Sequence, residues 1–302
     1  MSLNMDSIRI LREKIPSLCL EDAARLADHT SFRIGGAAAM AFPNTEAELK
    51  ELLTVTHENG IPVRILGAGT NVLAPDEGVE ELVICLKDCL TGLRDLGGGR
   101  IEAMAGETLC RTAVFARNLG LTGLEFAHGI PGTVGGGAYM NAGAYGGEFK
   151  HVAEQTTVFL MDGTEKVFVG EEQDFSYRHS AFEKQPCVVV KTVFQLATGD
   201  KDEIQAKMHE LMERRRASQP LELPSAGSTF KRPAGYFAGA LIEGAGLKGK
   251  GVGAAQVSPK HAGFIVNLGG ATAADVKNTI EFVQKTVMES AGVMLEPEVR
   301  IW

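Results

Sequence analysis

The sequence predicts an α+β fold in which helices and strands are grouped unevenly along the chain. Three observations support this prediction. The N-terminal third mixes helix and strand signals, the middle of the chain contains three consecutive strand candidates, and a charged helix near residues 201–218 precedes a further change in composition. A chain of 302 residues has room for two or three domains and a sizeable buried core.

The first predicted helix spans residues 45–59. Thr45 and Glu48 form a T-x-x-E capping box at its start, and Gly60 stands where the helix should end. Its apolar residues recur at helical spacing and predict a buried face: Leu49, Leu52 and Leu53.

Two strands and a second helix follow. Residues 61–66 (IPVRIL) predict a strand that runs into the sequence GAGTN, and residues 82–86 (LVICL) predict another strand. A helix is expected over residues 108–119, with its end at Gly120.

Strand candidates then dominate, before helices return near the C-terminus. The predicted strands are residues 156–161, 165–169 and 187–196. The predicted later elements are helices at 201–218, 236–243 and 273–290 and a terminal strand at 298–302. The charged 201–218 helix is the expected boundary between two parts of the chain.

Composition and charge exclude several classes of function. The formal net charge of −8 argues against a general nucleic-acid binder. Five cysteines without C-x-x-C spacing argue against a disulfide framework or a zinc ribbon, and no metal site is predicted. No segment resembles a signal peptide or a membrane span, so we expect a cytoplasmic protein. The 36 glycines lie in short clusters without a fixed period, which indicates turns that contact a ligand.

The first glycine cluster, residues 67–71 (GAGTN), directly follows a predicted strand. Its glycines would let backbone N–H groups approach a diphosphate closely. Val72 occupies the position of the third glycine of a Rossmann fingerprint, and Pro75 and Asp76 argue against a following helix. These residues alone leave two interpretations open, a tight turn and a phosphate-binding turn.

The second glycine cluster, residues 129–147, carries no charge until Glu148. With Pro131 and Asn141 among its glycines, it is expected to make a poor exposed loop and a poor helix. Such a segment can wrap a flat ligand and offer main-chain donors at short range. The alternative is a structural coil packed between domains.

Tyr177 and Arg178 in FSYRHS resemble an anion clamp, because a guanidinium can hold a carboxylate through two parallel hydrogen bonds. A surface salt bridge is the alternative. Ser228 in AGSTFKRP has neither a nearby histidine base nor a G-x-S-x-G motif, so locally it is interpreted as a loop serine.

The segment LEPEVR near the C-terminus supplies three alternating charges, Glu296, Glu298 and Arg300. They would share one face of a strand that is regular through Pro297. Solvated strand charges are the simpler interpretation.

Seven segments in this order resemble the UDP-N-acetylenolpyruvoylglucosamine reductase family, also called UDP-N-acetylmuramate dehydrogenases. They are TSFRIGG, LGAGTNVL, GIPGTVGGGAYMNAGAYG, YRHS, AGSTFKRP, AGLKGKGVGAAQVSPKHAGFIVN and LEPEVR. Each motif is weak by itself, but seven in register cover most of the chain.

The resemblance implies the FAD-binding fold of the vanillyl-alcohol oxidase type, with an α+β substrate-binding domain at the C-terminus. The implied FAD-binding region is 1–200, in two subdomains of about 1–66 and 67–200. The implied substrate-binding domain is 201–302, with its final strand returning toward the active site. Non-covalent FAD would be held by Gly67, Ala68, Gly69, Thr70, Asn71, Val72, Leu73, Gly129, Ile130, Pro131, Gly132, Thr133, Gly135, Gly136, Gly137, Asn141, Ala142, Gly143 and Ala144.

The resemblance also implies an activity. NADPH would reduce FAD, and the hydride would then pass to the enolpyruvyl ether of UDP-N-acetylglucosamine-enolpyruvate, giving UDP-N-acetylmuramate for peptidoglycan synthesis. Ser228 matches the family's proton donor, and Arg178 and Glu298 match the charged residues beside the enolpyruvyl group.

Tyr177, Lys231 and Arg232 are the residues expected to contact the substrate. Arg232 stands where the long-form enzymes often carry Asn, and the interval 177–228 is too short for their extra substrate-covering loop. Both departures indicate the shorter subclass of the family.

Two alternatives accompany this interpretation. One is another FAD-dependent oxidoreductase of the same fold, and the other is a non-catalytic flavin- or nucleotide-binding module. Under all three, we expect a small-molecule ligand, no nucleic acid, no membrane insertion and no obligate protein partner.

Overall fold

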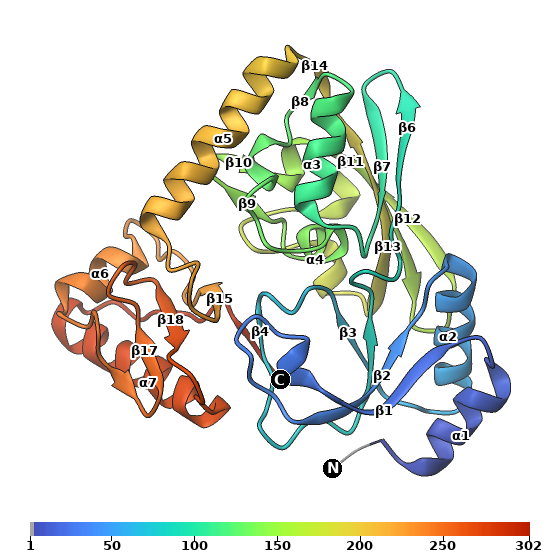
Figure 1. Ribbon diagram of the computed structural model, residues 1–302, viewed down its shortest axis with the longest axis horizontal. Coiled ribbons are helices and arrows are strands. Elements are labelled where there is room, and N and C mark those ends of the chain that lie inside the picture. The colour runs from blue at the N-terminus through green and yellow to red at the C-terminus, as the bar shows by residue number, and fades with distance from the viewer. Residues whose placement is uncertain (1–2) are drawn as a thin grey trace.

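The computed structural model describes residues 3–302, which form three larger sheets, three two-stranded pairs and the helices between them (Figure 1). This arrangement confirms the α+β class. Over the same residues, none of the helices has both the length and the apolar content needed to cross a bilayer.

The first sheet has four strands in the order β1-β2-β5-β3. They are β1 (Cys19–Arg25), β2 (Ala37–Phe42), β5 (Leu82–Cys85) and β3 (Val63–Leu66). β1 runs antiparallel to β2, whereas β5 pairs in parallel with β2 and β3. Helices α1 (Met5–Lys14) and α2 (Glu46–Glu58) contribute to the same core as this sheet.

The second sheet has five antiparallel strands in the order β12-β11-β13-β7-β6. They are β12 (Glu165–Val169), β11 (Ala153–Leu160), β13 (Cys187–Gln195), β7 (Arg100–Met104) and β6 (Leu93–Gly97). Its helices are α3 (Leu109–Asn118) and the short α4 (Val134–Tyr139). Two antiparallel pairs lie nearby, β8 (Leu121–Thr122) with β14 (Ala197–Thr198) and β9 (Gly143–Ala144) with β10 (Gly147–Glu148).

Helix α5 (Lys201–Ser218) leads from this region into the C-terminal lobe, drawn in orange and red in Figure 1. The sheet of that lobe has the order β15-β18-β17-β16. Its elements are β15 (Ser225–Ser228), α6 (Ala238–Gly244), β16 (Gly251–Val252), β17 (Ala255–Val257), β18 (Phe264–Asn267) and α7 (Ala273–Ala291). The chain then returns to the middle of the molecule, where β19 (Arg300–Ile301) pairs in parallel with β4 (Val72–Leu73).

The hydrophobic core follows this path. One buried cluster joins the first sheet to the second, and a smaller one covers the other face of the first sheet. The buried cluster of the C-terminal lobe also includes Phe32, Ile34 and Leu73 from the N-terminal part of the chain. The lobe therefore does not have a core built from its own sequence alone.

Most elements expected from the sequence are confirmed. The predicted helices correspond to α2, α3, α5, α6 and α7, and the predicted internal strands to β3, β5, β11, β12 and β13. At α2, the Thr45 hydroxyl accepts the Glu48 N–H at 3.1 Å, while the Glu48 carboxylate accepts from Asn44 rather than from Thr45. No helix follows Gly67–Asn71, in agreement with the rejection of a Rossmann turn.

Two expectations were wrong in detail. The second glycine cluster was expected to make a poor helix, yet residues 134–139 form α4. The terminal strand is only two residues long, because Pro297 pairs with Phe230 and the regular strand begins at Arg300. The three alternating charges of LEPEVR therefore do not lie on one regular strand.

Candidate functional site

A cavity of about 1000 Å³ lies between the two glycine clusters and the returning C-terminal segment. This volume is at the upper end of the range for pockets that hold small molecules and cofactors. Its wall includes residues 67–72, 130–133, 135–137, 219–228 and 300–302. Segments far apart in the sequence therefore build one site.

The two glycine clusters touch each other at Gly67 and Thr133. A Cβ added to Gly67 would lie 2.6 Å from the Thr133 hydroxyl oxygen, a separation that no side chain tolerates. Thr133 also caps α4, since its hydroxyl accepts the Gly136 N–H at 3.4 Å. The close approach thus explains a glycine at position 67 and brings both clusters to one cavity wall.

Helix α4 owes its glycines to packing rather than to helix propensity. A Cβ on Gly135 would lie 2.9 Å from the Ala105 Cβ, and one on Gly137 would lie 2.6 Å from the Phe149 ring. Gly136 has no atom outside α4's own neighbours closer than 3.5 Å, and it lines the cavity. Gly135 and Gly137 therefore let the helix pack closely against Ala105 and Phe149, and all three glycines line the cavity.

The structure brings most of the expected cofactor residues to this cavity. Those on the wall are Gly67, Ala68, Gly69, Thr70, Asn71, Val72, Ile130, Pro131, Gly132, Thr133, Gly135, Gly136, Gly137, Ala142 and Gly143. Four expected residues are not on the wall: Leu73, Gly129, Asn141 and Ala144.

The Asn141 side chain is occupied by protein partners. Its amide nitrogen donates to the Glu148 carboxylate and to the Ser176 carbonyl at 2.9 Å each, and its oxygen accepts the Lys150 N–H at 3.0 Å. Asn141 is fully buried. It ties the second glycine cluster to the turn that carries Tyr177 and Arg178.

That turn holds Arg178 in an unusual backbone conformation. Ser176 and His179 exchange two backbone hydrogen bonds of 3.1 Å, which leaves Tyr177 and Arg178 as the central residues of a tight turn. Arg178 has a φ of 54°, in the left-handed region that favours glycine. This conformation is unfavourable for a residue other than glycine, so the surrounding turn must hold Arg178 in it.

The Arg178 guanidinium faces Glu298. Its Nε donates to the Glu298 Oε1 at 2.5 Å, and both side chains are largely buried. Burial raises the pKa of the Glu298 carboxyl above its ordinary value, and the neighbouring Arg178 opposes this shift. The pair places a fixed cation beside a carboxyl that takes up a proton more readily than an exposed one.

Ser228 is held next to this pair by the residue that follows it. The Thr229 carbonyl accepts the Glu298 N–H at 2.7 Å, and the Thr229 N–H donates to the Gly263 carbonyl at 2.8 Å. Ser228 ends β15 opposite Phe264 and lines the cavity together with Arg178 and Glu298. The structure therefore brings together the three residues Arg178, Ser228 and Glu298.

A second hollow of about 460 Å³ shares these three residues with the large cavity. Tyr177 and Arg232 lie on its wall, and the Tyr177 hydroxyl accepts the Arg232 N–H at 3.0 Å. Lys231 is on neither wall, and its ammonium donates to the Glu296 carboxylate at 2.5 Å. Two of the three expected substrate residues thus face the second hollow.

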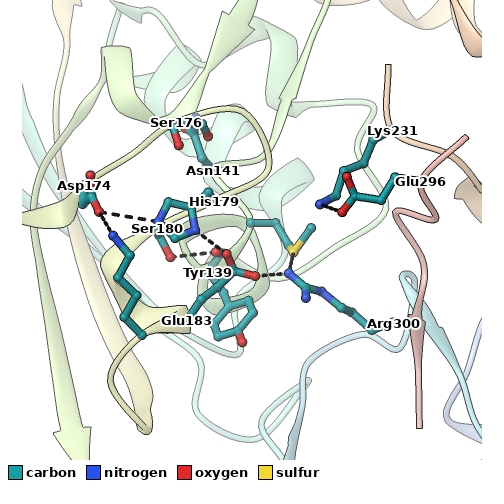
Figure 2. Close-up of polar contacts among 12 residues, drawn as sticks. Tyr139, Asn141, Asp174, Ser176, His179, Ser180, Glu183, Lys231, Glu296 and Arg300 are labelled. Carbon is teal, nitrogen blue, oxygen red and sulfur yellow. Dashed lines mark hydrogen bonds and ion pairs between the residues drawn. The ribbon is translucent and has the colours of Figure 1, made fainter. Parts of the chain in front are cut away.

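A chain of polar contacts begins at Glu183 and Arg300 on the wall of the large cavity (Figure 2). Arg300 donates to Glu183, whose carboxylate also meets His179 Nδ1 at 2.5 Å. On its other side, His179 lies 3.5 Å from Asp174, which pairs with Lys184 at 2.7 Å. Glu296, Glu298 and Arg300 thus take three separate partners instead of acting as one group.

Some cavity residues were missed from the sequence. Arg215 is one, although a signal existed, because the buried residues Ile204, Met208 and Leu211 of α5 continue at helical spacing to position 215. Glu183 and Arg300 also line the cavity, and no local pattern shows that they meet. Among residues 3–302, no group of His, Cys, Asp or Glu side chains suits a metal ion.

The residues fit a dinucleotide flavin. Glycines let the backbone approach a diphosphate, and apolar side chains such as Ile65, Leu66 and Ile130 offer a surface for a flat ring. The basic residues on the wall are Arg33, Arg178, Arg215 and Arg300. The cavity therefore offers an apolar surface for a flat ring and positive charge for a negatively charged cofactor.

Comparisons with known proteins agree with this architecture. Residues 37–168 match the FAD binding domain family. Residues 219–302 match the family described as UDP-N-acetylenolpyruvoylglucosamine reductase, C-terminal domain.

Full-length relatives support the same assignment. Two curated proteins named UDP-N-acetylenolpyruvoylglucosamine reductase are similar to the chain: one from Limosilactobacillus reuteri is 48% identical over 96% of this chain and 97% of its own, and one from Listeria monocytogenes is 46% identical over 96% and 97%. The crystal structure of the UDP-N-acetylenolpyruvylglucosamine reductase from Thermus caldophilus matches with a TM-score of 0.81 and 38% identity, covering 94% of this chain and 99% of that one.

Proposed function

The chain belongs to the UDP-N-acetylenolpyruvoylglucosamine reductase family, and from this premise we propose that Arg178, Glu298 and Ser228 carry its reaction. It is an FAD-dependent oxidoreductase of peptidoglycan synthesis that reduces UDP-N-acetylglucosamine-enolpyruvate. We propose that its FAD-binding region, which matches the FAD binding domain family, has the vanillyl-alcohol oxidase type of fold. The observation that carries the proposal is the position of these three side chains where the two hollows meet.

FAD, when bound, would supply the hydride, and we propose NADPH as its source. Hydride addition to the β-carbon of the enol ether places negative charge on the α-carbon and its carboxylate. Arg178 is suited to bind that carboxylate, because its guanidinium is fixed by Glu298 at 2.5 Å and therefore needs little rearrangement. Glu298 keeps Arg178 oriented and shares the charge of the site.

Ser228 donates the proton that completes the reaction. The α-carbon of the enolic intermediate is basic enough to accept a proton from a weak acid such as a hydroxyl. The Thr229–Glu298 hydrogen bond of 2.7 Å holds the serine segment beside the charged pair. The proton therefore arrives at the carbon next to the carboxylate that Arg178 binds.

The second hollow is the proposed place of the UDP-sugar. Tyr177 and Arg232 line it, and Arg232 can face a phosphate because its guanidinium has no carboxylate partner among residues 3–302. Lys231 would reach the substrate only by leaving Glu296. In this proposal, residues 1–200 bind FAD, residues 201–302 bind the substrate, and the enzyme works in the cytoplasm without an obligate protein partner.

The proposal is tested by one spectroscopic experiment. The flavin bands of the purified protein should bleach when NADPH is added without air, and return when the enolpyruvyl UDP-sugar is added. Bands that bleach but do not return would remove the substrate assignment. Bands that do not bleach with NADPH would remove NADPH as the hydride donor.

Replacing the proton donor should separate the two half-reactions. Ser228→Ala should leave bleaching by NADPH unchanged and slow turnover of the UDP-sugar by roughly 10²- to 10⁴-fold, the usual contribution of a positioned acid. Stopped-flow absorbance measures both steps, and Ser290→Ala on the exposed side of α7 is the control. An unchanged rate of flavin reoxidation in Ser228→Ala would assign the proton to another group.

A further inference from the structure

Helix α5 carries a buried cation that the reaction described above does not use. The Arg215 side chain comes from the apolar stripe of the helix, and the residue is only 9% exposed. One guanidinium nitrogen donates to the Gly129 carbonyl. Its Nε is buried and has no hydrogen-bond partner among residues 3–302.

Such a group is unfavourable in a protein that has no further use for it. A buried charge is normally paired, and a buried N–H is normally bonded. Within the described part of the chain no carboxylate pairs with Arg215, whereas its neighbours Arg214 and Arg216 pair with Glu210 and Glu213 on the exposed side of the helix. Burial lowers the pKa of the Arg215 guanidinium, and Tyr145 opposes this shift.

The position of Arg215 indicates which ligand could supply the missing partner of its guanidinium. The side chain lines the large cavity and lies against Gly129, where the second glycine cluster begins. Of the other cations of the wall, Arg178 and Arg300 are already paired with Glu298 and Glu183, and Arg33 is exposed rather than buried. Arg215 therefore offers a cation that no carboxylate neutralises, beside a glycine segment that admits phosphates.

We propose that Arg215 binds the diphosphate of FAD and supplies the charge that holds it in the cavity. A guanidinium suits this role because its planar donors can bond two phosphate oxygens at once. The inference rests on the flavoenzyme assignment above. It also links the cofactor to the substrate side, because α5 continues directly into residues 219–228, which line the cavity and end at Ser228.

The test compares Arg215→Met with wild type for ligands with and without a diphosphate. FAD released from diluted holoenzyme is followed by flavin fluorescence, and the full-length protein stripped of FAD is titrated with riboflavin. Loss of a charge-assisted bond should raise the Kd for FAD roughly 10- to 100-fold and leave the Kd for riboflavin unchanged. Arg215→Lys should recover part of the affinity, and Arg216→Met, an exposed neighbour, should match wild type.

Three results would overturn the inference. An unchanged Kd for FAD would mean that the diphosphate lies elsewhere. Equal losses for FAD and riboflavin would mean that Arg215 only supports the fold through Gly129. Normal FAD binding with a raised KM for NADPH or the UDP-sugar would assign the cation to one of those diphosphates. Wild-type protein that binds no FAD would remove the flavoenzyme assignment as well, so the two failures are distinguishable.

Discussion

Arg178 shows how one residue can be retained against its backbone preference. Its φ of 54° is a conformation that glycine adopts without strain and that costs other residues about 1–2 kcal/mol. The position nevertheless carries an arginine whose Nε lies 2.5 Å from Glu298. The side chain at this position, not the stability of the turn, accounts for the residue.

The strain can be measured by two substitutions that remove the same guanidinium. Arg178→Gly and Arg178→Ala both leave Glu298 unpaired, but only glycine relieves the left-handed conformation. We expect Arg178→Gly to be more stable than Arg178→Ala by about 1 kcal/mol in urea unfolding, while both lose turnover of the UDP-sugar. Equal stability of the two variants would show that the turn relaxes and that no strain is held there.

Glu298 should make stability depend on pH in a defined direction. Because its folded-state pKa is raised, the folded protein holds this proton more tightly than the unfolded chain does. The associated stability is fully present below the ordinary carboxyl pKa of about 4.3 and is lost as the pH rises through the raised value. Glu298→Gln removes this contribution.

The measurement compares the melting temperatures of wild type and Glu298→Gln between roughly pH 4 and pH 8. This range runs from the ordinary pKa of a glutamate carboxyl to well above it. The advantage of wild type over the variant should shrink as the pH rises. Subtracting the two curves cancels the other titrating groups, provided that they act independently. A difference that grows with pH would mean that Arg178 outweighs burial and that the pKa is lowered.

At the scale of elements, we expect alanine substitutions at two adjacent glycines of α4 to have opposite effects on stability. Gly135→Ala places a Cβ 2.9 Å from the Ala105 Cβ, so the free energy of unfolding should fall by about 1–3 kcal/mol. Gly136→Ala meets its first neighbour at 3.5 Å, so stability should stay the same or rise by up to about 1 kcal/mol from better helix propensity. Because Gly136 lines the cavity, its methyl group should instead weaken FAD binding, by about tenfold or more.

Denaturant unfolding and flavin-release measurements on the two variants separate these effects. Gly136→Ala is the control for packing, because it adds a methyl group to the same helix without a close contact. If Gly136→Ala binds FAD as tightly as wild type, the cofactor does not approach α4 at that residue.

The same helix shows where sequence reasoning stops. Helices α2, α3, α5 and α7 were predictable because each carries its own caps and apolar spacing. In α4 the glycines conflict with helix propensity, and the reason for them lies in Ala105 and Phe149, which are distant in sequence. The short strands β15 to β18 were missed for a similar reason, since strand pairing depends on partners that no local window contains.

The candidate site was predictable in its parts but not in its assembly. Glycine clusters and the segment around Ser228 are visible in the sequence, and the structure brings most of them to one cavity. The pairing of Arg178 with Glu298 crosses 120 residues and required the returning C-terminal segment. Arg215 was missed because it lies in a charged helix, although the apolar residues Ile204, Met208 and Leu211 recur at helical spacing up to its position.

The C-terminal lobe is connected to the rest of the molecule by packing and hydrogen bonds as well as by helix α5. Phe32 and Ile34 are buried in the core of the C-terminal lobe, and the Asn267 side chain donates to the Phe32 carbonyl at 2.9 Å. At the other end of the chain, the Trp302 N–H donates to the Leu73 carbonyl at 3.1 Å. The lobe should therefore unfold together with the FAD-binding region as one cooperative unit.

Phe32→Ala tests this coupling, because Phe32 is 1% exposed and fills the shared core. Removing its ring should lower the free energy of unfolding by about 3–5 kcal/mol. Unfolding in urea is followed by far-UV circular dichroism and by the fluorescence emission of Trp302, the single tryptophan of the chain. Trp302 lies where the returning C-terminal strand meets Leu73. In wild type the two signals should change together, and in Phe32→Ala both should still change together but at lower urea than in wild type. Phe282→Ala, which truncates a ring that is 37% exposed on α7, is the matched control and should shift the midpoint little. If Phe32→Ala behaves like this control, the lobe is stabilised by its own residues, and the returning strand rather than the shared core holds the active site together.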